Sequence, residues 1–160
     1  MRALSARISI SCTYAPSSPP SPDMLEVGCQ HGPGGPSDPG LSDDETASHF
    51  GAWCIVSSPL ILSHDLTNKT VMDRVWPLIS NKDALKVNQA WDGFSGSVFL
   101  QANATVALKD VIQEEAPVPV WQMFYKPIGA GQIAVFLMNH DSVSATLNLP
   151  FSAVPGLSST

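Results

Sequence analysis

Apolar side chains follow two different periods along this chain. Between residues 42 and 90 they recur mainly every three or four positions, which is the spacing of a helix packed on one side. From residue 93 onward they fall in short runs rich in β-branched and aromatic residues, a pattern typical of strands. The sequence therefore predicts a helical part followed by a part built from β-strands.

A first helix is expected to begin at Ser42. Ser42 and Glu45 have the spacing of a capping box, and the carboxylates of the first turn favour the positive end of the helix dipole. Apolar side chains then recur at helical spacing until Pro59, which disfavours helical geometry in the residue before it. We therefore expect a helix between Ser42 and Pro59.

A second helix is expected from Val71 to about Asn81, because its apolar residues again recur at helical spacing. Short apolar segments at residues 23–28 and 60–63 precede the two helices and are predicted to be strands. The order strand, helix, strand, helix is typical of a parallel sheet covered by helices, in which loops at the C-terminal ends of the strands carry the chemistry. Two such units cannot close a barrel.

The remaining segments divide the chain. Four prolines within residues 16–22 disfavour a central strand, so residues 1–21 are expected to form a disordered leader. Residues 22–91 hold the strand-helix units, with a Gly/Pro-rich loop at 28–40, and residues 92–160 form an incomplete antiparallel β-domain with a hairpin turn at 127–131. Its strands are predicted at residues 97–100, 105–108, 118–125, 132–139 and 144–149.

The composition of the chain favours a folded protein and argues against nucleic acid and membranes as partners. The chain has 160 residues, 44% of them hydrophobic and 14% charged, which favours a packed interior over disorder. A net charge of -6 argues against a nucleic-acid partner. The longest uncharged apolar run, residues 52–62, is far shorter than the roughly 20 residues of a membrane helix, so we expect no membrane span. Residues 2–15 lack the sustained apolar centre of a convincing signal peptide.

Cysteine and histidine spacing leaves one alternative open. Cys12, Cys29 and Cys54 share no zinc or redox spacing and define no disulfide framework. A metal site could be drawn from Cys29, His31, His49 and Cys54. The favoured interpretation is a buried Cys54 on a helix and a loop Cys29, with no metal and no cofactor.

Two Asn-x-Thr sequons start at Asn68 and Asn103. Such triplets are acceptors for N-glycosylation, although they also arise by chance. They favour a secreted or vacuolar protein.

Four motifs in order resemble the alpha-galactosidase (melibiase) family, glycoside hydrolase family twenty-seven. They are Pro-Asp-Met-Leu-Glu-Val-Gly at residues 22–28, the helix that holds His-Phe at 49–50 and Trp53, the Pro-Leu-Ile-Leu strand at 59–62, and the segment from Ser-Asn-Lys at 80–82 to Val-Asn-Gln at 87–89. The resemblance covers residues 22–89 and fades beyond them.

The resemblance implies the last two βα units of a (β/α)8 TIM barrel, followed by a truncated antiparallel β-domain. It implies hydrolysis of terminal alpha-linked galactose with retention, by a parent enzyme that is secreted or vacuolar/lysosomal. In the family the nucleophile lies in a Lys-Phe-Asp block and the acid/base in an Arg-x-x-x-Asp block, and neither occurs in these 160 residues. We therefore expect an inactive C-terminal fragment without catalytic residues.

Two residues match the sugar-contacting positions of the family. Asp23 is expected to accept hydrogen bonds from adjacent sugar hydroxyls, and Met24 to pack on the apolar face of the ring. The implied partners are alpha-galactoside oligosaccharides or glycoconjugates. The alternative interpretation makes Asp23 a solvated turn residue and Met24 part of the core.

Other residue groups are weaker candidates. Ser63, His64 and Asp65 are consecutive and cannot form a triad, so Asp65 is expected to be a local cap or loop residue. Glu26 and Asp23, three apart on an extended segment, face opposite sides and cannot form a catalytic pair. Four aromatic residues are expected in the core rather than as sugar platforms, namely Trp76, Trp91, Trp121 and Phe124.

Two further hypotheses belong to other classes. The chain could be a non-catalytic fragment that binds carbohydrate or a protein, or a truncated reading frame that does not fold stably. The oligomeric state is left open by the sequence.

Overall fold

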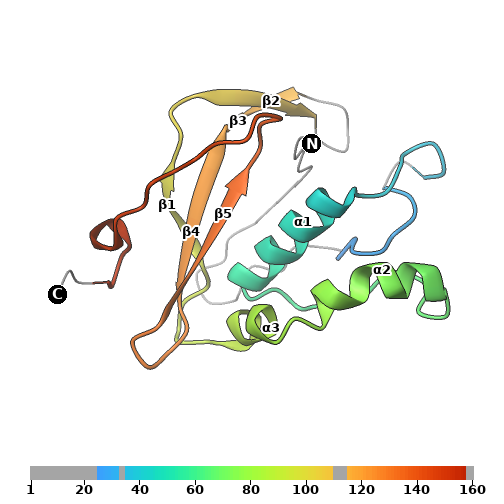
Figure 1. Ribbon diagram of the computed structural model, residues 1–160, viewed down its shortest axis with the longest axis horizontal. Coiled ribbons are helices and arrows are strands. Elements are labelled where there is room, and N and C mark those ends of the chain that lie inside the picture. Colours follow the sequence, from blue (N-terminus) through green and yellow to red (C-terminus); the bar gives the residue numbers. More distant parts are fainter. Residues whose placement is uncertain (1–24, 33–34, 110–114, 158–160) are drawn as a thin grey trace.

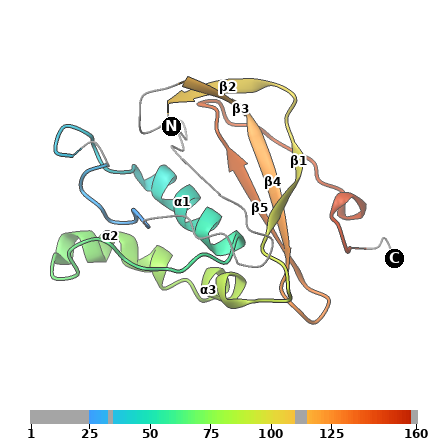
Figure 2. The same cartoon turned by 180° about the vertical axis from the view of Figure 1, so that it is seen from behind.

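The computed structural model describes residues 25–32, 35–109 and 115–157. Three helices lie on one side of the molecule and a three-stranded antiparallel sheet lies on the other (Figure 1). The view from behind shows the same two layers, with α1 beside the sheet, α3 near its lower end and α2 farthest from it (Figure 2). The leader expected at residues 1–21 lies outside the described residues.

Helix α1 (Asp43–Ile55) confirms the first helix and its capping box. The Ser42 amide donates to Glu45 Oε2 at 2.9 Å, and the Glu45 amide donates to Ser42 Oγ at 3.3 Å. Eight of its 13 residues are buried, because α1 lies between the sheet and the other two helices. It is the centre of the molecule.

The second predicted helix is confirmed as α2, and a further helix that the sequence did not predict, α3, follows it. Helix α2 (Lys69–Ile79) is capped by Asn68, and helix α3 (Lys82–Gln89) is capped by Asn81, whose Oδ1 accepts from the amides of residues 83 and 84. Sequence periodicity missed α3 because it has only eight residues, and none of them is fully buried.

The two expected parallel strands are reduced to one bridge. Leu25 pairs with Leu62 in parallel, which confirms that the two segments lie side by side, but neither forms a regular strand within the part of the chain that the structure describes. Pro59 has no amide to donate on one segment. Gly28 has φ +82° and turns the other segment away, so the pairing does not extend.

Three strands between residues 97 and 139 build the sheet with the order β1-β4-β5. Strands β4 and β5 form the predicted hairpin, from the pair Trp121 and Asn139 to the pair Pro127 and Ile133. The bounds are β1 (Ser97–Gln101), β4 (Trp121–Pro127) and β5 (Ile133–Asn139). A separate antiparallel pair is formed by β2 (Thr105–Lys109) and β3 (Glu115–Pro119).

Two strand predictions were wrong in detail. The run at 118–125 is split at Val120, whose amide donates to Ala104 O and whose carbonyl accepts from the His140 amide, so the chain passes there from one sheet to the other. Residues 144–149 form no strand, because no described strand pairs with them, and the chain continues to the short 3-10 helix η1 (Phe151–Ala153).

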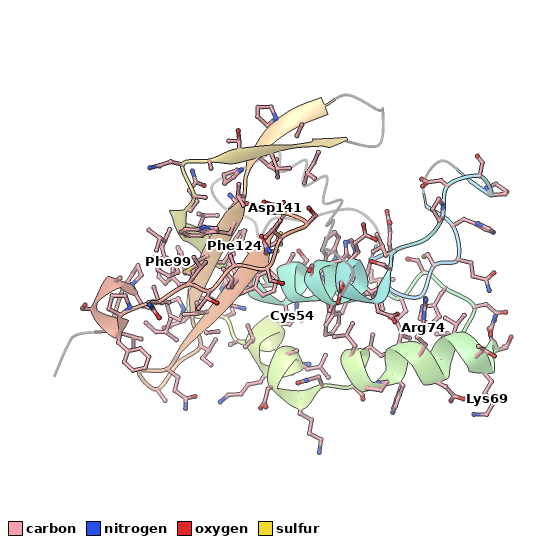
Figure 3. All side chains as sticks on the ribbon, turned by 45° about the horizontal axis from the view of Figure 1, so that its top comes forward. Cys54, Lys69, Arg74, Phe99, Phe124 and Asp141 are labelled. Atoms are coloured by element: carbon pink, nitrogen blue, oxygen red, sulfur yellow. The ribbon has the colours of Figure 1, made fainter. Side chains whose placement is uncertain are left out.

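One apolar core joins the helices to the sheet. Phe50, Trp53 and Ile55 of α1 are in the same buried cluster as Phe124 and Met138 of the sheet. Figure 3 shows the side chains between the helices and the sheet, with Cys54 on α1 and Phe124 on β4 labelled. Within the described residues no helix is long and apolar enough to cross a membrane.

Candidate functional site

The parallel bridge places two chain segments at one edge of the molecule. Since Leu25 and Leu62 pair in parallel, the residues that follow them, 26–28 and 63–66, leave the bridge in the same direction. The candidate sugar contacts Asp23 and Met24 directly precede this bridge and lie outside the described residues.

His49 connects α1 to the first of these segments. Its Nε2 accepts a hydrogen bond from the Glu26 amide at 3.0 Å, so this nitrogen carries no proton. The ring is buried and lies 3.9 Å from the Trp53 ring, centroid to centroid. Glu26 is flanked by Leu25 and Val27, both almost fully buried. The motif residues His49 and Trp53 therefore fix the position of the segment that continues from Asp23 and Met24.

His64 connects the two segments to each other. Its Nδ1 lies 2.7 Å from Val27 O, and its Nε2 lies 3.2 Å from the sulfur of Met72 on α2. A side chain on Gly28 would overlap the His64 ring, so a glycine is required for this close approach as well as for its positive φ. Sequence reasoning missed the contacts of His64 with Val27 and Gly28, because they join residues 37 and 36 positions apart.

The loop at 28–40 forms a hairpin-like arm beside this edge. His31 and Pro39 form an antiparallel bridge, and the amides of Gly32 and Gly40 donate to Asp38 O and Gln30 O. Burial raises the pKa of the Glu26 carboxyl, and the nearby charge of Asp38 raises it further. Burial and the charge of Glu26 also raise the pKa of the Cys29 thiol, which disfavours a reactive thiolate at neutral pH.

Several curated proteins are similar to this chain. Alpha-galactosidase 2 of Arabidopsis thaliana is 31% identical over 150 residues, which are 92% of this chain and 31% of that protein. The alpha-galactosidase of Cyamopsis tetragonoloba is 29% identical over 133 residues, 83% of this chain and 26% of that protein. Alpha-galactosidase 3 of Arabidopsis thaliana is 30% identical over 139 residues, 87% of this chain and 26% of that protein. This chain is alpha-galactosidase-like.

The expected resemblance is thereby confirmed, and it extends farther than residues 22–89 because the similarity covers most of the chain. The alpha-galactosidase-like chain spans less than a third of the length of these three relatives. No family model matches it, and no solved structure matches it significantly.

The consecutive Ser63, His64 and Asp65 of the alpha-galactosidase-like chain form no triad. Ser63 Oγ donates to Ile61 O, and the His64 ring contacts Val27 and Met72. Asp65 Oδ1 accepts from the amide and the hydroxyl of Thr67, at 2.8 and 2.6 Å, and these hydrogen bonds lower its pKa. Asp65 therefore stabilises a turn in the loop before α2, whose N-cap is Asn68, in agreement with the expected local role.

The alternative metal site is wrong. Cys29, His31, His49 and Cys54 are all described, and no group of three or more His, Cys, Asp or Glu side chains in the described ranges could hold a metal ion. His49 is engaged by the Glu26 amide. Cys54 is buried on α1, and burial raises its pKa to about 11, although the charge of Lys126 opposes this shift. The loop Cys29 and the helical, buried Cys54 agree with the favoured interpretation.

Two aromatic residues correct the core prediction. Phe124 is 8% exposed and Trp121 is half-buried, as expected, but Trp76 is 57% exposed and Trp91 is 56% exposed. Trp76 lies beside the buried stripe of α2 formed by Val71 and Val75, so helical spacing alone placed it on the wrong side. Trp91 follows the end of α3 at Gln89, so helical spacing does not apply to it.

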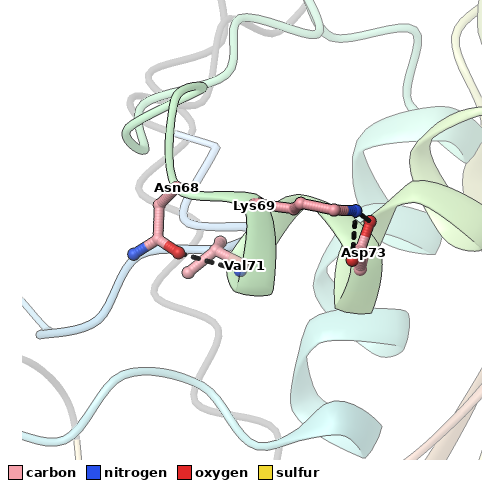
Figure 4. Close-up of polar contacts among 4 residues, drawn as sticks. All are labelled: Asn68, Lys69, Val71 and Asp73. Atoms are coloured by element: carbon pink, nitrogen blue, oxygen red, sulfur yellow. Dashed lines mark hydrogen bonds and ion pairs between the residues drawn. The ribbon is translucent and has the colours of Figure 1, made fainter.

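The two sequon asparagines have different surroundings. Asn103 is exposed between β1 and β2. Asn68 caps α2 by accepting from the Val71 amide through Oδ1, at 3.2 Å, beside the ion pair between Lys69 and Asp73 (Figure 4). This cap uses the oxygen of Asn68 and leaves the side-chain nitrogen pointing away from the helix (Figure 4).

Proposed function

We propose that the chain is part of a glycoside hydrolase that cleaves terminal alpha-linked galactose with retention of configuration. The observation that carries this proposal is the similarity to plant alpha-galactosidases across both the helical part and the sheet part. On this proposal, residues 22–91 are the last two βα units of a (β/α)8 barrel, and residues 92–160 belong to the β-domain that follows it. The parallel bridge between Leu25 and Leu62 supports the first assignment.

Asp23 and Met24 are proposed to contact the sugar. Their segment enters the parallel bridge at Leu25, and the next residue is held to α1 by His49. An ionised Asp23 would accept hydrogen bonds from two adjacent hydroxyls and orient the galactose, while Met24 would cover the apolar face of the ring. Neither residue would take part in bond cleavage.

Retention requires two carboxyl groups about 5 Å apart, one as nucleophile and one as acid/base. These 160 residues contain neither a Lys-Phe-Asp block nor an Arg-x-x-x-Asp block. We therefore expect the isolated chain to show no turnover, because covalent and acid-base catalysis are both lost. The measurement is chromophore release from p-nitrophenyl alpha-galactoside, with the Coffea arabica alpha-galactosidase as the active control. Release by the purified chain above the buffer rate would refute the expectation.

Sugar contact is tested separately from turnover by titration calorimetry. We expect heat of binding with melibiose, and its loss in Asp23→Ala. Asp92→Ala is the matched control, since Asp92 is an exposed carboxylate that follows α3. Equal binding by both variants would remove Asp23 from the proposed site.

A non-catalytic fragment that binds carbohydrate is the second candidate. The exposed indoles of Trp76 and Trp91 favour it, because sugars stack on exposed aromatic rings. In this case Trp76→Ala or Trp91→Ala would weaken glycan binding more than Asp23→Ala does. If calorimetry gives no heat of binding with any alpha-galactoside, and the chain shows no cooperative thermal unfolding, the remaining hypothesis is a truncated reading frame that does not fold.

We also propose a secreted or vacuolar location, with N-glycosylation at Asn68 and Asn103. The exposure of Asn103 and the orientation of the Asn68 side-chain nitrogen are compatible with attachment. When the chain is expressed in a eukaryotic secretory system, its mass should fall on treatment with peptide N-glycosidase F by the mass of two glycans. Asn68→Gln and Asn103→Gln should each remove one of these two glycans. An unchanged mass would contradict the glycosylation proposal.

A further inference from the structure

Lys126 is a lysine whose side chain is completely buried. It lies on β4, in the strand at the centre of the sheet, and it is 0% exposed. Its Nζ donates to Ser57 Oγ at 2.5 Å, to the carbonyl of Val87, and to the carbonyl of Asn88 at 3.4 Å. All three acceptors belong to the helical part of the chain.

The acceptors lie at two helix ends. Ser57 follows the end of α1 at Ile55, and Val87 and Asn88 are in the last turn of α3. The last carbonyls of a helix have no partner within the helix and carry the negative end of its dipole. The ammonium group of Lys126 donates to two carbonyls in the last turn of α3, and at the end of α1 it donates to the Ser57 hydroxyl. Its positive charge is favourable at both of these helix ends.

Lys126 has no carboxylate partner among the described residues. The other titratable group that faces it is Cys54 on α1, whose thiol is neutral at pH 7 because burial raises its pKa to about 11. Burial lowers the pKa of Lys126. Its charge is therefore compensated by oriented dipoles and a hydroxyl rather than by an anion, which requires a well-formed set of oxygen acceptors.

The backbone conformation of Ser57 indicates that the oxygen atoms around the Lys126 ammonium group form a specific niche. Ser57 is not a glycine but has φ +59°, a backbone conformation that costs free energy for such a residue. Its hydroxyl accepts from Lys126 and lies 3.5 Å from Ala90 O, so it connects α1, β4 and the end of α3. The strained turn thus presents the hydroxyl to the ammonium.

We propose that Lys126 is a charge-dependent clamp that holds the sheet on the helices, through a niche of three oxygen atoms that selects a primary ammonium group. Apolar contacts such as Phe136 against Gly51 bring the two layers together. The clamp fixes β4 against the ends of α1 and α3. This inference is independent of the proposed catalytic function.

The first test compares Lys126→Met with the wild-type chain. Methionine keeps the apolar length but removes the charge and the donors, so the melting temperature should fall by about 5–10 °C. Lys86→Met is the matched control. Lys86 Nζ also links the two layers, to Gln132 Oε1 at 2.9 Å, but it is exposed, so its loss should shift the melting temperature by less than about 2 °C. Hydrogen exchange should rise at residues 82–90 and 121–127 in Lys126→Met alone.

The second test uses Lys126→Ala, which lacks the last three carbons and the ammonium group. n-Propylammonium has those atoms, and n-propanol is its neutral counterpart. Propylammonium should raise the melting temperature of Lys126→Ala, or restore its circular dichroism if the variant is unfolded, and propanol should not. The wild-type chain should respond to neither.

Two results would overturn the proposal. One is a Lys126→Met variant as stable as the wild-type chain, which would mean that the buried charge gives no net stabilisation. The other is an equal response of Lys126→Ala to propylammonium and propanol, which would mean that the cavity takes any small solute and does not select an ammonium group.

Discussion

Helix α1 and strand β5 differ in a way that composition does not anticipate. The segment Ile133–Asn139 is apolar at nearly every position, yet Val135 is 41% exposed and Leu137 is 46% exposed. The segment Asp43–Ile55 is much more polar, yet it buries Thr46, Ser48 and His49 together with its apolar residues.

The cause is position in the fold. Helix α1 contacts α2 and α3 on one side and β4 and β5 on the other, so little of its surface remains outside. Strand β5 packs on α1 through one face, and its other face carries the exposed side chains. Burial in this chain follows what lies opposite a residue rather than how apolar the residue is.

The strongest test of this comparison removes a large side chain from each element. Phe50→Ala on α1 should lower the free energy of unfolding by about 3–5 kcal/mol, because Phe50 is 2% exposed and its removal leaves a cavity. Leu137→Ala on β5 should cost less than about 1 kcal/mol. Urea unfolding of both variants checks this, and similar losses would contradict the comparison.

A glycine at the contact between α1 and β5 gives a second test, in which a substitution that normally stabilises a helix should instead destabilise the chain. Gly51→Ala inside α1 would ordinarily stabilise the helix by about 0.5–1 kcal/mol. Here the added methyl group would overlap the Phe136 ring of β5, so we expect a loss of about 1–3 kcal/mol. Phe136→Leu in the same chain should recover part of that loss, as a double-mutant cycle in urea would show. A stabilising Gly51→Ala would mean that the sheet does not press on α1.

The first turn of α1 offers a smaller effect, set by local structure alone. Ser42→Ala removes the hydroxyl that accepts from the Glu45 amide and should cost about 1 kcal/mol. Ser152→Ala in the exposed η1 segment is the control and should change thermal stability very little. A neutral Ser42→Ala would show that burial alone holds α1 in place.

The reactivity of the Cys54 thiol tests the burial of α1 without a mutation. At pH 8 Cys54 should react with iodoacetamide at least about 100-fold more slowly than Cys29, because a pKa of about 11 leaves little thiolate and the thiol is buried. Its rate should rise with pH up to about 11, as the thiolate fraction grows. Peptide mass spectrometry follows both sites, and both should react alike in denaturant. Equal rates in the folded chain would place Cys54 at the surface.

Sequence patterns were reliable where the structure depends on residues that are close together in the sequence. Ser42 and Glu45 fixed the beginning of α1, and the Gly-rich turn at 127–131 fixed the β4–β5 hairpin. The same reasoning failed for α3, which is too short for a clear period, and for Trp76 and Trp91, whose exposure depends on what covers them. For the candidate site, the motif identified the right segments but not the hydrogen bond from Glu26 to His49.

The sequence by itself therefore determined the resemblance to alpha-galactosidases, the beginning of α1 and the turn of one hairpin, because each depends on residue order or on hydrogen bonds between near neighbours. The tertiary structure decided which faces are buried, that Leu25 lies beside Leu62, and that the charge of Lys126 is placed at two helix ends. These features join residues 37 to 69 positions apart. Their free energies depend on which groups meet in space, and local periodicity carries no information about that.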